Sequence, residues 1–202
     1  RYITDLAEEV FPGGVHGSPE VPTEKDLAAA VLLAAERRIV PNSKVLDRYR
    51  HVVCALLFVA TTSRPDLAWA VSMLTRCLNY PTAELLKAAE RVLMYAYTHR
   101  QLAITYRKGS QGTRPDMHWA PVLGPTLDAA SDANLDIQRA TSGSFVFLSQ
   151  AVISWMSKKQ NSIALHSTEA EIMAGSLAAC ELVFLRGILA DMGLMQTEPT
   201  VL

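Results

Sequence analysis

The chain has 202 residues, of which half are hydrophobic and 19% are charged, so it can bury a core and is not a disordered tail. Its formal net charge is −1, with 15 Lys and Arg against 12 Asp and Glu up to residue 125, and 4 against 8 beyond it. This asymmetry would suit a nucleic-acid surface beside a cation site, but it is too small to establish either one.

The cysteines and the hydropathy pattern predict an intracellular protein with no membrane span. Cys54, Cys77 and Cys180 lie far apart without metal-ligand spacing, so we expect reduced, buried thiols. No apolar run reaches the roughly 18 residues that a membrane helix needs. The first residues include neither a starting Met nor the apolar core of a signal peptide, which predicts a piece of a longer chain.

The first half of the sequence predicts a compact helical unit, which we assign to residues 1–106. Apolar residues recur at helical spacing, and Pro and Gly separate the segments. The segment at 45–61 is so apolar that we expect most of its circumference to be buried. A short strand at 102–106 is expected to close the unit. The predicted helices cover residues 3–11, 24–39, 45–61, 67–74 and 85–97.

The second half predicts a different architecture. Gly, Pro and charged residues at 107–125 indicate a linker. The domain that follows, 126–202, is expected to hold strands at 126–132, 144–148 and 152–156, and then a helix at 168–192 that Gly193 ends. The order strand, strand, strand, helix predicts the α/β or α+β class.

Asp132 is the first candidate for chemistry because it ends the first predicted strand, four residues after Asp128. A strand-end carboxylate beside a helix that carries another carboxylate can hold Mg²⁺, which prefers oxygen ligands and keeps several waters. The alternative is that Asp132 only forms a turn, as Asp often does at strand ends.

Glu171 is the second candidate. Glu169 and Glu171 are about 200° apart around a helix, so only one of them can face the sheet. Ala174, Gly175 and Ala178 follow Glu171 at helical spacing, and such small side chains allow a close approach to a sheet. We therefore expect Glu171 to reach toward Asp132, and Glu169 to favour the positive end of the helix. A first-turn acid without chemistry remains the alternative for Glu171.

Lys158, Lys159 and Gln160 follow the third predicted strand and could contact a phosphate backbone through charge and amide. A solvated hairpin end without a ligand is the alternative interpretation.

Several motifs together resemble the copia-type retrotransposon Pol polyproteins. The Arg-Pro-Asp block, the Ile-Ser-Trp-x-Ser-Lys-Lys-Gln block and the Ser-Thr-Glu-Ala-Glu block carry the resemblance in order and spacing, and the match covers nearly the whole chain. The matching segments are Tyr49 to Ala68, Ser131 to Asn134, Thr141 to Phe147, Ile153 to Gln160 and Ser167 to Glu171.

The resemblance implies a fold and an activity. Residues 1–106 would be the C-terminal helical part, thumb and connection, of a reverse transcriptase, and residues 126–202 the first half of a ribonuclease H domain. Asp132 and Glu171 match two of the family's four metal-binding carboxylates, so Mg²⁺ or Mn²⁺ would be weakly bound. The implied partners are an RNA–DNA hybrid and the remainder of the Pol polyprotein, in a cytoplasmic particle or the nucleus.

Two other interpretations stay open for the chain itself. The polymerase Tyr-x-Asp-Asp turn and the later ribonuclease H carboxylates are not among these residues, and Leu135 and Ile172 replace aromatic residues that are usual in the family. A non-catalytic relic that binds nucleic acid or only keeps the fold core is therefore one alternative. An unrelated α/β interaction domain is the other.

Overall fold

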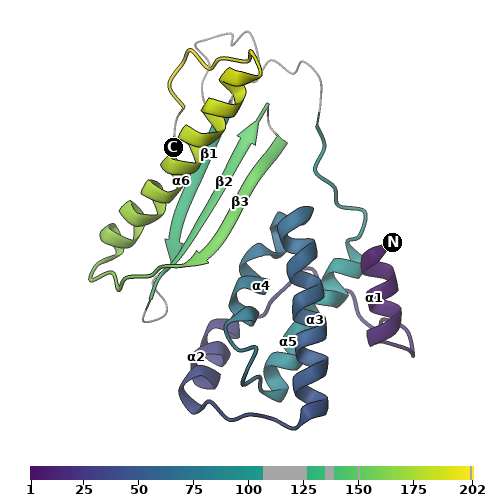
Figure 1. The fold of residues 1–202 in the computed structure, drawn as a ribbon. Helices are drawn as coiled ribbons and strands as arrows, with labels where there is room; N and C mark the ends of the chain where they lie inside the picture. Colours follow the sequence, from purple (N-terminus) through teal and green to yellow (C-terminus); the bar gives the residue numbers. More distant parts are fainter. Residues whose placement is uncertain (107–126, 135–138, 150, 201) are drawn as a thin grey trace. The chain divides into compact units, whose positions relative to one another are not determined.

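The computed structural model describes residues 1–106, 127–134, 139–149, 151–200 and 202. The chain divides into two compact units, Arg1–Ala103 and Ile104–Leu202 (Figure 1). The predicted linker at 107–125 lies outside the described residues. Each unit is described by itself below.

The first unit is helical, and its helices begin where the sequence places start signals. The Asn42 side chain accepts the Val45 N–H at 3.0 Å, and the Thr82 hydroxyl accepts the Leu85 N–H at 3.2 Å. Each contact satisfies a backbone donor that the first helical turn leaves unpaired. The elements are α1 (Tyr2–Val10), α2 (Leu27–Arg37), α3 (Ser43–Thr62), the short 3₁₀ helix η1 (Pro65–Leu67), α4 (Ala68–Thr75) and α5 (Ala83–Thr98).

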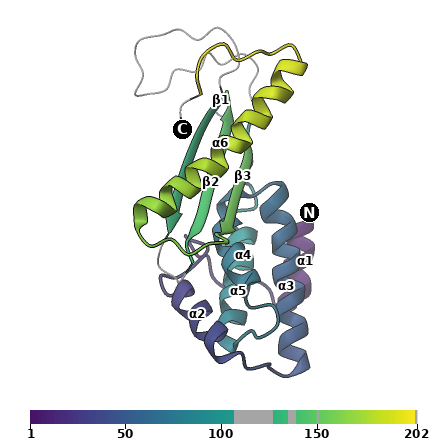
Figure 2. The same cartoon turned by 60° about the vertical axis from the view of Figure 1, so that its left-hand side comes forward.

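Helix α3, the longest helix of this unit, packs against α1, α4 and α5 (Figure 2). Tyr49 and Leu56 are completely buried, and the Tyr49 hydroxyl donates to the Leu74 carbonyl at 2.7 Å. The expectation that most of the circumference is buried is wrong, because Leu57 and Phe58 are 39% and 57% exposed. Neighbouring helices therefore cover one side of α3.

The Arg-Pro-Asp block joins the start of η1 to the end of α5. The buried Arg64 guanidinium donates to both carboxylate oxygens of Asp66, at 2.8 and 2.6 Å, and to the His99 carbonyl at 3.1 Å. This hydrogen bonding with Asp66 raises the pKa of Arg64. The motif thus has a structural role in the helical unit.

Two further expectations about this part of the chain need correction. Residues 102–106 do not form a strand, although the Tyr106 hydroxyl donates to the Val152 carbonyl at 3.1 Å. Cys77 is buried as expected, whereas Cys54 and Cys180 are exposed. Both exposed thiols lie on outward faces of helices, which residue type alone does not reveal.

The second unit is a three-stranded antiparallel sheet followed by a long helix, which confirms the α+β class. The strands are β1 (Leu127–Asn134), β2 (Thr141–Leu148) and β3 (Ala151–Lys159), in the order β1-β2-β3. The helix α6 (Ser167–Asp191) lies across one face of the sheet (Figure 1). Among the described residues, β1 is therefore an edge strand.

Helix α6 packs on the sheet through a stripe of small residues. Ala174 and Ala178 are buried, as predicted, Ala170 extends this stripe by one turn, and larger residues continue the contact toward the C-terminal end. The apolar core of this unit contains Leu127, Ala129, Val146, Leu182 and Leu189.

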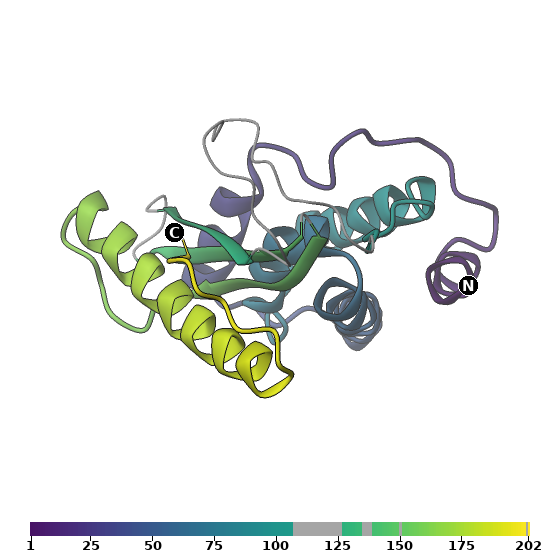
Figure 3. The same ribbon diagram turned by 90° about the horizontal axis from the view of Figure 1, so that it is seen from above.

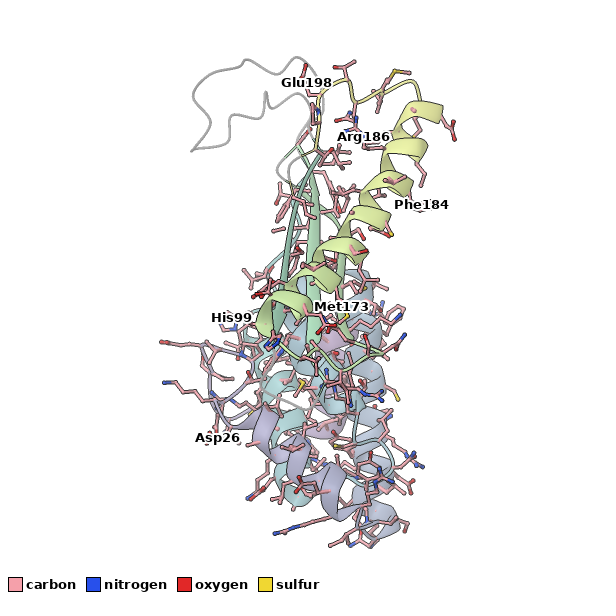
Figure 4. The ribbon with its side chains drawn as sticks, turned by 90° about the vertical axis from the view of Figure 1, so that its left-hand side faces the viewer. Asp26, His99, Met173, Phe184, Arg186 and Glu198 are labelled. Atoms are coloured by element: carbon pink, nitrogen blue, oxygen red, sulfur yellow. The ribbon has the colours of Figure 1, made fainter. Side chains whose placement is uncertain are left out.

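The outward side of α6 is also apolar. Val183 and Phe184 are 71% and 62% exposed, and Phe184 projects from the helix away from the sheet (Figure 4). By length and composition, α6 is the one helix of the described residues that could cross a membrane. A helix that covers a sheet with one face can satisfy the same criterion, and the Ser154 hydroxyl donates to the Glu181 carboxylate at 2.8 Å across this packing contact.

Candidate cation and nucleic-acid site

Asp132 lies near the end of β1, opposite Gly143 of β2. The side chain is exposed, and its Oδ1 accepts the N–H of the next residue, Ala133, at 2.8 Å. The other carboxylate oxygen, Oδ2, does not take part in this hydrogen bond. Because β1 is an edge strand in the described part of the chain, the Asp132 carboxylate can extend toward the open edge of the sheet.

The two acids at the start of α6 have different surroundings. The Glu169 carboxylate accepts the Leu165 N–H at 2.8 Å, so it stabilises the beginning of the helix, as the sequence predicts. Glu171 is exposed and lies one turn before Gly175. A β-carbon placed on Gly175 would lie 3.8 Å from the Ser131 hydroxyl oxygen. Helix α6 therefore approaches β1 next to Asp132, one turn after Glu171.

The strand register shows how the two carboxylates are oriented. Ser131 faces α6, and side chains alternate along a regularly paired strand, so the Asp132 side chain leaves β1 on the other face. Asp132 therefore lies on the other side of β1 from the helix that carries Glu171, and a cation held by both carboxylates would have to sit at the edge of the strand. Within the described residues, no three His, Cys, Asp or Glu side chains gather into a metal-binding group. A cation here would therefore complete its coordination with water or substrate oxygens.

Lys158 and Lys159 are the last two residues of β3, and both are exposed. They pair with Ser142 and Thr141 of β2, so their side chains leave the sheet on opposite faces. The sequence places them after the strand, whereas the structure includes them in it. Both side chains thus lie at the end of the sheet where β3 leads into Gln160.

Gln160 is inside the unit and is 5% exposed. Its Nε2 donates to the Ser142 hydroxyl and to the Ala170 carbonyl, both at 2.9 Å, and its backbone N–H donates to the Ala140 carbonyl at 2.8 Å. Gln160 therefore ties β2 to the first turn of α6, immediately before Glu171. The Gln160 amide therefore binds other protein atoms and is not exposed for contact with a phosphate.

The residues that hold the candidate site residues in place could not be identified from the motifs. Ser142 and Ser144 are buried polar residues on the α6 side of β2, and Ser142 accepts the Gln160 amide. The Thr-Ser-Gly-Ser run at 141–144 did contain a signal, because Ser142 and Ser144 alternate along a strand and so share one face. If that face is buried, each hydroxyl needs a polar partner nearby. Arg186 of α6 was also missed.

Comparison with known proteins places the chain among transposon proteins. It is 38% identical over 143 residues to a putative transposon Ty5-1 protein of Saccharomyces cerevisiae, covering 70% of this chain and 44% of that protein. It is 29% identical over 208 residues to the retrovirus-related Pol polyprotein from transposon RE1 of Arabidopsis thaliana, covering all of this chain and 13% of the polyprotein. The chain thus spans less than half of either relative.

A third relative is named as an effector protein and not as a transposon protein. The chain is 36% identical over 137 residues to the secreted RxLR effector protein 161 of Plasmopara viticola, covering 68% of this chain and 90% of that protein. No family model matches the chain, and no solved structure matches it. Because transposon Pol polyproteins match along its whole length, the chain belongs to the copia-type retrotransposon Pol polyproteins.

Proposed function

We propose that the chain is the reverse transcriptase and ribonuclease H region of such a polyprotein. Residues 1–106 would be the helical thumb and connection part of the polymerase, and residues 126–202 the first half of the ribonuclease H domain. The parent activity would be RNA-directed DNA synthesis with hydrolysis of RNA in RNA–DNA hybrids. The observation that carries this proposal is the approach of α6 to β1 at Ser131. Asp132 is the next residue along β1, and Glu171 lies one turn before the contact on α6.

The two carboxylates supply the kind of ligands that hydrolysis of a phosphodiester needs. Asp132 and Glu171 would hold Mg²⁺ or Mn²⁺ at the edge of β1, with substrate phosphate and water as further ligands. Two such ions polarise a phosphodiester and activate a water for in-line attack. This chain's residues would bind the cation and orient it toward the RNA strand. With two protein carboxylates, binding of the cation alone is expected to be weak.

Lys158 and Lys159 would contribute a different part of the function. Their exposed ammonium groups can contact phosphates and release counterions from the hybrid, which makes binding strongly dependent on salt. Such contacts position a nucleic acid and carry no sequence information. Gln160, which is buried, would act by holding the start of α6 and not by contacting phosphate. The partners would be the RNA–DNA hybrid and the remainder of the polyprotein, inside the cell.

Titration of the full chain with Mn²⁺ tests the cation site. Asp132→Asn and Glu171→Gln are each expected to weaken Mn²⁺ binding by about tenfold or more, because changes around metal sites typically cost 10-fold to 100-fold. Glu169→Gln is the matched control, since Glu169 is an acid on the same helix that serves the helix start. Equal weakening by Glu169→Gln and Glu171→Gln would show diffuse attraction to the helix start and refute a defined site.

Cleavage of an RNA–DNA hybrid then tests the activity. We expect slow or no cleavage by this chain and faster cleavage by a longer Pol polypeptide that contains further carboxylates. Asp132→Asn in the longer polypeptide is expected to abolish the cleavage. Inactivity of both unmodified proteins, with Mg²⁺ and with Mn²⁺, would contradict the catalytic proposal.

The alternative is a non-catalytic module that binds nucleic acid or only preserves the fold core. One observation favours keeping it, because the matched region makes up 90% of a curated relative that is not named as a polyprotein. Hybrid binding that depends on salt but not on a divalent cation would support this module. In that case Lys158→Gln is expected to reduce the salt slope by about 1, while absence of binding at low salt would exclude a nucleic-acid role.

A further inference from the structure

The chain turns back on itself at the end of α6. Gly193 has a φ of +78°, a left-handed conformation that glycine adopts without strain. Its N–H donates to the Ala190 carbonyl at 2.9 Å, and the Leu194 N–H donates to the Leu189 carbonyl at 2.8 Å. These two bonds satisfy carbonyl groups of the last helical turn. The following described residues, 194–200 and Leu202, form what we call the return segment.

Arg186, on the last part of α6, binds the return segment with one guanidinium group. Its Nη1 donates to the Glu198 carbonyl at 2.9 Å and to the Thr200 hydroxyl at 2.7 Å, and its Nη2 donates to the Gln196 carbonyl. Figure 4 shows Arg186 and Glu198 near each other at this end of the helix. The acceptors are uncharged and lie along five residues of an irregular segment, a pattern that a planar, forked donor can serve.

The return segment leads toward the candidate cation site. It runs beside α6 in the direction of β1 (Figure 3). At its end, a methyl group of Leu202 lies 3.7 Å from the position of a β-carbon on Gly175, the same position that lies 3.8 Å from the Ser131 hydroxyl. Residues Ser131 and Gly175 are the neighbours of Asp132 and Glu171 described above. Arg186 thus binds a segment whose end contacts α6 about three helical turns before Arg186.

We propose that Arg186 is a positioning residue that holds the return segment along α6, so that its end packs on Gly175 and covers the α6-facing side of β1 next to the candidate cation site. Ordering an extended segment costs conformational entropy at every residue, and three hydrogen bonds from one side chain offset that cost. The first half of this proposal is that Arg186 holds the return segment, and it does not depend on the proposed function. The second half is that the held segment covers the candidate site. It rests on the proposed function, because it needs a cation to bind at Asp132 and Glu171.

Solution NMR of the full chain tests the first half. In the unmodified protein, the amides of the return segment are expected to have order parameters near those of rigid backbone, about 0.85, and to fall below about 0.6 in Arg186→Gln. A nuclear Overhauser contact between the Leu202 methyl and Gly175 α-protons should be present in the first protein and lost in the second. Retention of order and of this contact in Arg186→Gln would overturn the proposal.

Two further variants separate positioning from charge and from folding. Arg186→Lys keeps the positive charge, but a single ammonium cannot serve acceptors so far apart, so it is expected to release most of the segment. Thr200→Val removes one acceptor and is expected to release it partly. If Arg186→Lys behaved like the unmodified protein, the charge and not the forked geometry would act, and the proposal would be wrong. Unchanged chemical shifts in β2 show that the variants stay folded.

Titration with Mn²⁺ tests the second half. If the covering end of the segment is populated in only about a third of the Arg186→Gln molecules, the Kd for Mn²⁺ should rise roughly threefold. An unchanged Kd together with a released segment would overturn the covering role and leave the positioning role standing. Absence of Mn²⁺ binding to the unmodified protein would refute the proposed cation site, and the NMR result would still decide whether Arg186 holds the segment.

Discussion

Gln160→Glu is the substitution that best separates a nucleic-acid contact from a structural tie. The change keeps the shape of the side chain and replaces the NH₂ group by an oxygen. In the structure that NH₂ group donates to the Ser142 hydroxyl and to the Ala170 carbonyl, each at 2.9 Å. An ionised glutamate would place an acceptor against the Ala170 carbonyl, inside a site that is 5% exposed.

The expected loss of stability follows from these contacts. A net hydrogen bond contributes about 1 kcal/mol, and a buried acceptor left without a donor costs about 1–3 kcal/mol. The Ser142 hydroxyl can rotate and donate to the new carboxylate, whereas the Ala170 carbonyl cannot. We therefore expect Gln160→Glu to destabilise the second unit by about 2–4 kcal/mol at neutral pH.

Hydrogen exchange measured on peptides from β2 and α6 reports the stability of this unit separately from the helical unit. The defect is expected to be smaller at acidic pH, because burial favours the neutral carboxylic acid, which can donate one hydrogen bond again. Lys158→Gln is the matched control, since Lys158 is exposed at the end of β3, two residues before Gln160, and it is expected to change stability by less than about 0.5 kcal/mol.

The opposite pattern would refute this reasoning. If Gln160→Glu left exchange in β2 and α6 unchanged but weakened binding of an RNA–DNA hybrid more than Lys158→Gln did, Gln160 would be a surface contact, as the sequence pattern suggests. Fluorescence anisotropy of a labelled hybrid at two salt concentrations provides that comparison, because a phosphate contact changes the salt slope.

Further predictions concern both units. Arg64→Lys should lower the stability of the helical unit by about 2–3 kcal/mol in urea unfolding, since one ammonium cannot replace a nearly buried guanidinium with several acceptors; a loss below about 0.5 kcal/mol would contradict that role. Cys54 and Cys180 should react with a thiol reagent in the folded chain, and Cys77 only after unfolding. Burial raises the pKa of Cys77 from 9.0 to about 11, so the unfolded chain loses this proton first, and the urea midpoint of the helical unit should fall as the pH rises from 9.0 to about 11. Gly175→Ala should stabilise α6 by about 0.5–1 kcal/mol in thermal unfolding, because the added β-carbon would make ordinary contacts and alanine favours a helix; a destabilised variant would show that the contact is tighter than described.

The elements themselves could be predicted because their signals are local. Asn42 and Thr82 cap helices that begin two residues before the predicted ranges, and Gly193 follows the last helix as predicted. The alanine stripe of α6 also follows from spacing, since residues at i and i+4 share a face whatever lies opposite them. These features depend on the chain within a few residues, and the structure confirms them.

The surroundings of single side chains could not be predicted in the same way. Nothing in the Lys-Lys-Gln sequence distinguishes a buried glutamine from an exposed one, because its partners Ser142 and Ala170 come from other elements. Cys54 lies on an outward face that neighbouring helices leave open. Burial is set by tertiary contacts, and residue type gives only an average tendency.

The orientation of the two carboxylates determines how a cation could bind. Asp132 leaves β1 on the face away from α6, and Glu171 lies on α6, so a cation held by both as we propose would have to bridge them over the strand edge and take further oxygens from outside the protein. If an RNA–DNA hybrid supplies those oxygens, binding of hybrid and cation must strengthen each other by the same factor. Mn²⁺ should then bind more tightly in the presence of the hybrid, and the hybrid more tightly in the presence of Mn²⁺. Two independent affinities would show that the cation does not lie between these carboxylates and a phosphate.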